Sequence, residues 1–155
     1  MPNFFGRFVY QWVFRWKMER PILRLTHFPG SQQVDVKLVL NRATETTCNV
    51  DFSFVYTNQD LESQRWYFED FPYLADETSS KVAEHAVNRQ KEIGQEIFNQ
   101  VFSRSNESRK IWKKANSNLE SLRVEIADEN QNIPWEFICN TNSNQKPLPR
   151  SYTKH

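Results

Sequence analysis

The sequence has few of the residues that build covalent or metal-bound sites. Among 155 residues there are two cysteines, three histidines and three glycines. Cys48 and Cys139 lie far apart, and the histidines stand singly, so no zinc-ligand spacing occurs. Two scattered cysteines are typical of reduced thiols. We therefore expect a cytoplasmic protein that uses no disulfide, metal or cofactor.

A long apolar run and a strong net charge are also missing. The most apolar window, residues 4–16, is too short for a membrane-spanning helix and contains Arg7 and Arg15. It also lacks the small-residue cleavage site of a signal peptide. The net charge of +1 balances 20 basic against 19 acidic residues, which gives no reason to expect nucleic acid as a partner.

Aromatic residues, in contrast, are plentiful. They make up 14% of the chain, including 12 phenylalanines and 5 tryptophans. Because aromatic side chains bury large areas, a chain of this length can build one domain with a sizeable core. We expect three parts: an amphipathic N-terminal segment (residues 1–20), the domain itself (21–140) and a flexible polar tail (141–155).

Residues 1–20 have an aromatic face at helical spacing and a basic opposite face. The aromatic face is formed by Phe4, Phe5, Phe8, Val9, Trp12, Val13 and Trp16. Two interpretations stay open. The segment is either an interfacial helix that contacts a membrane surface or a partner, or a helix that packs on its own domain or frays.

The domain opens with a pattern of strands. Pro29 and Gly30 predict a turn, and the alternation of apolar and polar residues over 34–40 predicts a half-buried strand. The same alternation returns over residues 48–56, after a polar connection at 41–47. Two such strands across a short loop predict an antiparallel hairpin.

Three helices and a further strand follow. Asp60 is expected to cap a helix that Pro72 ends, and a longer helix is expected from Thr78 or Ser79 to Phe102. A short basic helix spans 107–116, and alternation over 122–126 predicts a strand. Pro134 suits a first helical position, Trp135 is expected to be a buried anchor, and Glu136 a charge for the helix dipole or an arginine. This order predicts an α/β fold with an incomplete, mostly parallel sheet.

Five features stand in a specific order: a hairpin, a Trp-Tyr-x-Glu-Asp helix, a helix with a glycine before an apolar pair, a short helix with a tryptophan, and a strand followed by Pro-Trp-Glu. The residues concerned are Trp66, Tyr67, Glu69, Asp70, Gly94, Trp112, Pro134, Trp135 and Glu136. Over about residues 21–140 this order resembles the opening part of a CHAT domain. These caspase-like modules are frequently attached to tetratricopeptide repeats in bacteria.

The resemblance implies a partial caspase-like fold and says where catalysis should lie. Peptidases of this family use a histidine and a cysteine, each at the end of a parallel strand well after the Pro-Trp-Glu motif. The family's histidine stands in a His-Gly pair, which this chain lacks, and Cys139 follows Glu136 by only three residues. We therefore expect no catalytic residues and no peptidase activity from the chain alone.

The expected function is accordingly that of a fragment or a regulatory, binding part of a caspase-like peptidase system. The strand at residues 122–127 should be interior in the complete fold, so here it would have an unpaired edge that favours a protein partner or self-association. Two alternatives stay open: half of a split cysteine peptidase, and a peripheral membrane or scaffold protein docked through residues 1–20. A small enzyme that uses Cys139 is a weaker one, because no cationic neighbour would lower the pKa of its thiol.

Two charged clusters could suggest ligand sites. Glu69 and Asp70 with Asp60 and Glu62 lack the glycine-punctuated spacing of a cation loop, so a solvated helix face is the better interpretation. The lysines around Trp112 form a patch too small to predict phosphate binding in a nearly neutral chain.

Overall fold

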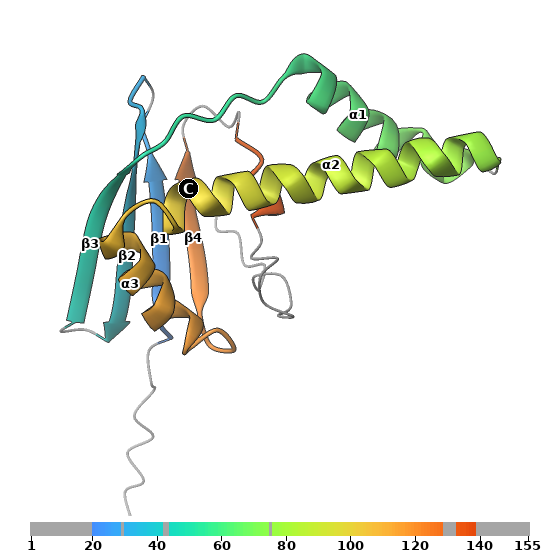
Figure 1. The fold of residues 1–155 in the computed structure, drawn as a ribbon. Helices are drawn as coiled ribbons and strands as arrows, with labels where there is room; N and C mark the ends of the chain where they lie inside the picture. The colour runs from blue at the N-terminus through green and yellow to red at the C-terminus, as the bar shows by residue number, and fades with distance from the viewer. Residues whose placement is uncertain (1–19, 29, 42–43, 75, 129–132, 139–155) are drawn as a thin grey trace, which may run out of the picture.

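The computed structural model describes residues 20–138, except 29, 42–43, 75 and 129–132 (Figure 1). The expectations for residues 1–19 and 139–155, Cys139 included, lie outside the described residues. The elements, in chain order, are β1 (Ile22–His27), β2 (Gln33–Asn41), β3 (Thr44–Asp51), α1 (Asn58–Glu69), the 3₁₀ turn η1 (Phe71–Tyr73), α2 (Glu77–Phe102), α3 (Asn106–Asn116), β4 (Arg123–Asp128) and the 3₁₀ turn η2 (Trp135–Phe137).

The four strands form one mixed sheet in the order β3-β2-β1-β4. β1 pairs antiparallel with β2, and β2 with β3, whereas β1 and β4 are parallel. The α/β class and the hairpin of β2 and β3 are thus confirmed. The expectation of a mostly parallel sheet is wrong for the described residues, where two of the three strand pairs are antiparallel. β4 lies at the edge of this sheet.

The sequence patterns missed β1 and misplaced β3. Pro21 and Pro29 flank β1 and make residues 21–30 resemble a loop, yet Leu23 and Leu25 alternate and are buried. The turn after β1 is as expected: Gly30 has a φ of +74°, which glycine adopts without strain, and Ser31 N–H donates to the Phe28 carbonyl at 3.1 Å.

β3 begins four residues earlier than its apolar alternation, because its polar first half still pairs with β2. The polar connection predicted at 41–47 is therefore mostly strand. At its other end, the predicted strand continues too far. β3 ends at Asp51. Phe52 N–H still donates to the Gln32 carbonyl at 2.8 Å, and an extended connection to α1 follows.

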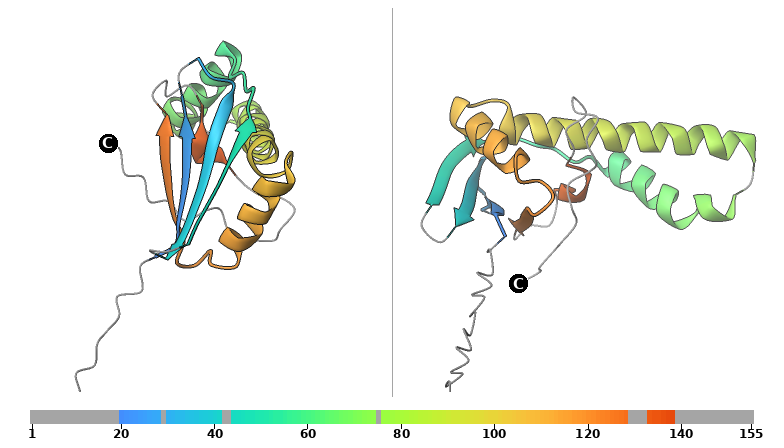
Figure 2. Two further views of the ribbon diagram at one scale, coloured as in Figure 1. Left: turned by 90° about the vertical axis from the view of Figure 1, so that its left-hand side faces the viewer. Right: turned by 90° about the horizontal axis from the view of Figure 1, so that it is seen from below.

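The core lies on one face of the sheet. Leu23 and Leu25 of β1 and the buried valines of β2 face α2 and α3, which lie on the same side in all three views (Figures 1 and 2). The helices contribute Ile93, Ile97, Val101, Phe102, Ile111 and Ala115 to this layer. A single apolar layer between helices and sheet is the expected solution for a domain of this size.

The opposite face of the sheet is charged. Arg24 Nη2 lies 2.6 Å from Glu125 Oε2 across β1 and β4, and Lys37 Nζ lies 2.5 Å from Glu45 Oε1 across β2 and β3. Such cross-strand ion pairs are typical of a face that is exposed to water. The fold therefore has two layers, with helices on one side of the sheet.

The helices largely match their prediction. α2 begins one residue before Thr78, with the Asp76 side chain accepting from Ser79 N–H, and ends at Phe102. α1 differs at its start: Thr57 is the N-cap residue, and Asp60 is the third residue of the helix. Within the described ranges, no helix combines the length and the apolar character that crossing a bilayer requires.

α1, η1 and the first part of α2 extend beyond the sheet as an arm, which we define as residues 58–86 (Figures 1 and 2). The second half of α2 covers the sheet, whereas its first half packs mainly on α1. At the end of the arm, Tyr67 stacks on Phe71 with ring centroids 5.7 Å apart, and Trp66 lies 5.8 Å from the same ring.

The Pro-Trp-Glu junction forms a short turn instead of a full helix. Pro134 is the N-cap of η2 rather than its first helical residue, so the expected position is corrected by one. Trp135 is 5% exposed, which confirms it as a buried anchor, whereas Glu136 is exposed.

Candidate functional site

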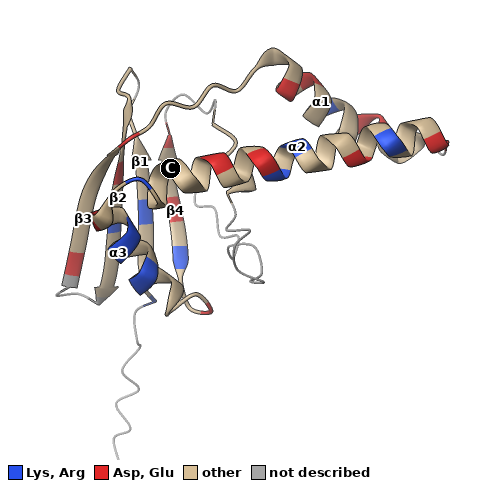
Figure 3. Cartoon of the chain, in the orientation of Figure 1, with Lys and Arg blue, Asp and Glu red and all other residues tan. Residues whose placement is uncertain are grey.

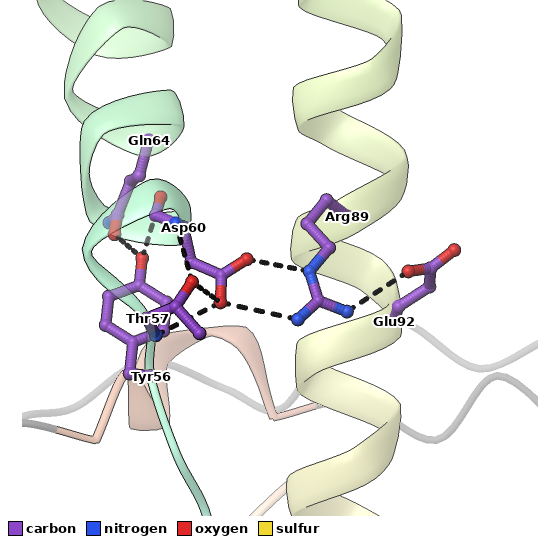
Figure 4. Close-up of polar contacts among 6 residues, drawn as sticks. All are labelled: Tyr56, Thr57, Asp60, Gln64, Arg89 and Glu92. Atoms are coloured by element: carbon purple, nitrogen blue, oxygen red, sulfur yellow. Dashed lines mark hydrogen bonds and ion pairs between the residues drawn. The ribbon is translucent and has the colours of Figure 1, made fainter.

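Two polar clusters, each with a buried carboxylate, stand out in the described residues, and the first joins the arm to the rest of α2 (Figure 4). The Asp60 carboxylate accepts from Arg89 Nε at 2.8 Å and from Arg89 Nη2 at 3.3 Å. It also accepts from Thr57 N–H at 3.2 Å and from the Thr57 hydroxyl at 2.7 Å, while Asp60 N–H donates to that hydroxyl oxygen at 3.1 Å. This reciprocal arrangement is a capping box whose carboxylate also binds the neighbouring helix.

The cluster continues on both sides of the carboxylate. The Tyr56 hydroxyl donates to the Gln64 side-chain oxygen, and Arg89 Nη1 reaches Glu92 Oε2 at 3.3 Å. The groove beside the cluster, between α1 and α2, has a volume of about 920 Å³. Its lining mixes acidic, basic and amide side chains, so it favours no one class of ligand.

The charges of the cluster are mutually stabilised. The hydrogen bonds from Arg89 lower the pKa of Asp60 from 3.8 to about 2, against the opposing effect of burial. The same bonds raise the pKa of Arg89 further above its usual range. Burial, followed by the Asp60 charge, raises the pKa of Tyr56 to about 12. With its carboxylate and guanidinium committed to each other, the cluster acts as a clamp between α1 and α2.

This clamp predicts a loss of stability in acid. Because the folded-state pKa of Asp60 is depressed, its contribution is complete above the unfolded-state pKa and is lost as pH falls from about 4 to about 2. We expect the free energy of unfolding, measured by urea titration, to fall by about 2 kcal/mol more in the wild type than in Asp60→Asn over this range. Equal losses in both proteins would contradict the clamp. Asp76 also has a lowered pKa, so both proteins lose some stability in acid for that reason. The difference between their two losses therefore reports on Asp60.

The second cluster lies where the parallel strands β1 and β4 end. Their register places His27 opposite Asp128, and His27 Nδ1 lies 3.1 Å from Asp128 Oδ1. The other carboxylate oxygen of Asp128 accepts from Trp135 Nε1 at 2.9 Å. The Trp135 ring stacks on Phe52 at 5.4 Å between centroids, and the His27 ring meets the same phenylalanine edge-on at 5.9 Å.

This second cluster is well shielded from water and fixes the segment after β4. The side chains of His27 and Asp128 are only 12% and 4% exposed. A His–Asp pair could orient a catalytic base. However, His27 contacts Asp128 through Nδ1 and Phe52 through its ring, and neither partner is a nucleophile of the serine or cysteine type. The geometry instead makes Asp128 a bridge that holds Trp135 against the sheet.

Cys48 is poorly placed for nucleophilic chemistry. It is a half-buried free thiol on β3, and β2 lies between it and β1, which carries His27. Burial raises the pKa of this thiol, and the charges of Glu107 and Asp35 raise it further. A raised pKa lowers the fraction of thiolate, which is the reactive form. Within the described part of the chain, the structure does not bring Cys48 together with His27.

The motif residues of the sequence analysis fall in separate places. Trp66 and Tyr67 belong to the arm, where Glu69 forms a surface ion pair with Arg65 at 2.8 Å. Gly94 is buried in α2. Trp112 packs against Phe98 and Phe102 with centroids 4.9 Å apart. Among these motif residues, Trp135 alone joins one of the polar clusters.

Sequence reasoning named Asp60 as a cap and Trp135 as an anchor, but it missed their partners Arg89, His27 and Asp128. The signal for the clamp was available, since Thr57 and Asp60 have the spacing of a capping box. The signal for His27 and Asp128 was not, because it depends on the pairing of β1 with β4. Within the described residues, no group of three or more histidine, cysteine or acidic side chains could hold a metal ion.

The edge of β4 is the remaining candidate. Arg123 N–H donates to the Pro21 carbonyl at 2.8 Å, so the alternation of a parallel ladder turns the N–H and C=O groups of Val124 and Ile126 outward. No described strand pairs with this outer edge. Side-chain burial also decreases from β1 to β4, because Leu23 and Leu25 are fully buried, whereas Ile126 is only half-buried.

Comparison of the chain with protein-family models, with curated proteins and with solved structures gives no match.

Proposed function

We propose that the chain is a non-catalytic protein-binding module that accepts a partner strand at the outer edge of β4. The observation that carries the proposal is the combination of outward-facing backbone groups and a core that thins out at Ile126. A further strand would pair the backbone of Val124 and Ile126 and cover the exposed side of the core. The partner is either a strand of another protein or a second copy of this chain.

Two features favour the edge over other surfaces. The open face of the sheet is covered by ion pairs such as Arg24–Glu125, so stacking an apolar layer there would desolvate charges at high cost. The other edge strand, β3, exposes Glu45, Thr47, Asn49 and Asp51, a polar sequence typical of edges that resist pairing. β4 has apolar residues at alternate positions, and its exposed residue Ala127 has no polar side chain that would oppose strand pairing.

A relation to the opening part of a CHAT domain is part of the proposal. It is supported by the order of the elements and by the role of Trp135, which follows β4 directly and anchors the turn beneath α2. In that case β4 would be the strand onto which the rest of a caspase-like sheet is added. The chain would be a fragment or a regulatory part of a peptidase system in the cytoplasm, where the free thiol of Cys48 would stay reduced.

A split peptidase is the second candidate, and the parallel pairing of β1 and β4 favours it. The carboxyl end of β4 is the position at which a following parallel strand would bring catalytic side chains. Under this candidate the partner strand carries the missing histidine and cysteine. The same edge would then be used, and only the partner would differ.

Blocking the edge tests the proposal. We expect Ala127→Lys, which places a charge beside the outer edge without changing the core, to weaken self-association or partner binding about tenfold. Thr47→Lys is the matched control, because Thr47 is also an exposed edge-strand residue but lies on β3. Sedimentation velocity over a concentration series measures the effect. A wild-type protein that stays monomeric, or equal effects of both variants, would overturn the use of β4 for self-association.

A further inference from the structure

The arm has an exposed apolar surface that its own packing leaves uncovered. Leu61 and Phe68, seven residues apart and therefore on one side of α1, are 54% and 57% exposed. Tyr73 and Leu74 follow at the end of the arm, with Tyr73 87% exposed. Large apolar side chains gathered on one projecting element are typical of a binding surface.

The arm is also acidic. Residues 58–86 contain seven acidic and two basic residues, in a chain whose overall charge is close to zero. Figure 3 shows acidic positions on both helices of the arm, and basic positions on α2, α3 and the sheet. An occupant of this surface should therefore combine apolar side chains with positive charge. The arm's negative charge would repel an anionic membrane surface.

The chain itself contains a segment with this chemistry. Residues 4–17 include the aromatic face described above and carry Arg7, Arg15 and Lys17 without any acidic residue. Aromatic side chains and arginine are the residue types most enriched where binding energy concentrates. The apolar pattern and the charge of the segment are thus both complementary to the arm.

We propose that residues 4–17 bind the arm through the surface formed by Leu61, Phe68, Tyr73 and Leu74. The aromatic face of the segment covers these side chains, and its basic residues lie near the arm's acidic residues. This interaction is independent of the β4 edge. It gives residues 1–20 a protein surface as their target, either on the same chain or on a second copy.

Site-specific photo-crosslinking in the full-length protein tests this inference. A benzoylphenylalanine placed at position 12 should form its crosslinks with residues 58–86, mapped by mass spectrometry. Phe68→Gln should lower their yield about fivefold or more, because the segment loses an aromatic contact. Phe28→Gln is the matched control, since Phe28 is 48% exposed but follows β1, away from the arm. Its yield should equal that of the parent protein.

Two further measurements complete the test. Raising NaCl from about 0.05 to about 0.5 M should lower the yield, because salt screens exposed charges. Mixing the protein with an isotopically heavy copy shows whether the segment binds the arm of its own chain or of a second copy, since crosslinks between light and heavy chains form only in the second case. Crosslinks outside residues 58–86, a yield indifferent to Phe68→Gln, or capture of the segment by anionic phospholipid vesicles instead of the arm would overturn the inference.

Discussion

Trp135→Ala is expected to lower the free energy of unfolding by about 3–5 kcal/mol, the range for removing a large aromatic side chain from a core. Trp135 is 5% exposed, stacks on Phe52, and donates its indole N–H to Asp128. The substitution leaves a cavity between the sheet and η2 and removes one partner of a buried carboxylate. Urea unfolding followed by far-ultraviolet circular dichroism measures the loss.

Two controls separate the causes of this loss. Trp135→Phe keeps an aromatic ring on Phe52 but removes the donor to Asp128, so it should cost about 1–3 kcal/mol. Trp66→Ala removes a half-buried tryptophan from the arm and should cost less than Trp135→Ala. If Trp135→Ala cost under about 1 kcal/mol, the Pro-Trp-Glu turn would not be an anchor of the fold.

Asp60→Ala is expected to release α1 from α2 while the sheet stays intact. The variant removes the carboxylate that accepts from Thr57 N–H in the capping box and pairs with Arg89, and leaves the guanidinium without its main partner. We expect a local cost of about 2 kcal/mol, which corresponds to roughly 30-fold faster amide exchange in residues 58–69. Hydrogen exchange followed by mass spectrometry resolves this segment from β1 and β2, whose rates should not change.

Glu69→Ala is the matched control for Asp60→Ala. Glu69 lies on the same helix and also pairs with an arginine, but this pair with Arg65 is exposed. Exposed pairs contribute little, so exchange in α1 should change by about threefold at most. If both substitutions increased amide exchange in α1 equally, the buried Asp60–Arg89 pair would stabilise α1 no more than the exposed Glu69–Arg65 pair does.

The two variants also bear differently on the proposals. Asp60→Ala loosens the arm, so it should weaken binding of residues 4–17 while leaving the β4 edge unaffected. Trp135→Ala disturbs the segment that follows β4 and should affect the edge more than the arm. The distinction follows from the positions of the clusters, one at the base of the arm and one at the carboxyl ends of β1 and β4.

Local patterns in the sequence were sufficient for the helices and the hairpin. α2 was predicted to within two residues, because an N-cap acid and apolar residues at helical spacing act over short distances. The hairpin followed from alternation on both sides of a short connection. The errors at β3 and Asp60 arose where one local signal hid another. The polar residues at the start of β3 gave no sign of a strand. At α1, Asp60 was expected to be the N-cap, but Thr57, three residues earlier, has that position.

By itself, the sequence determined the elements with their own periodicity and the need to bury Trp135, since these depend on neighbours along the chain. Only the tertiary structure decided that β1 joins the sheet, that β4 forms its edge, and that both polar clusters exist. His27 and Asp128 are 101 residues apart, and Asp60 and Arg89 are 29 apart. Contacts over such separations depend on how strands pair and helices pack, which periodicity does not encode.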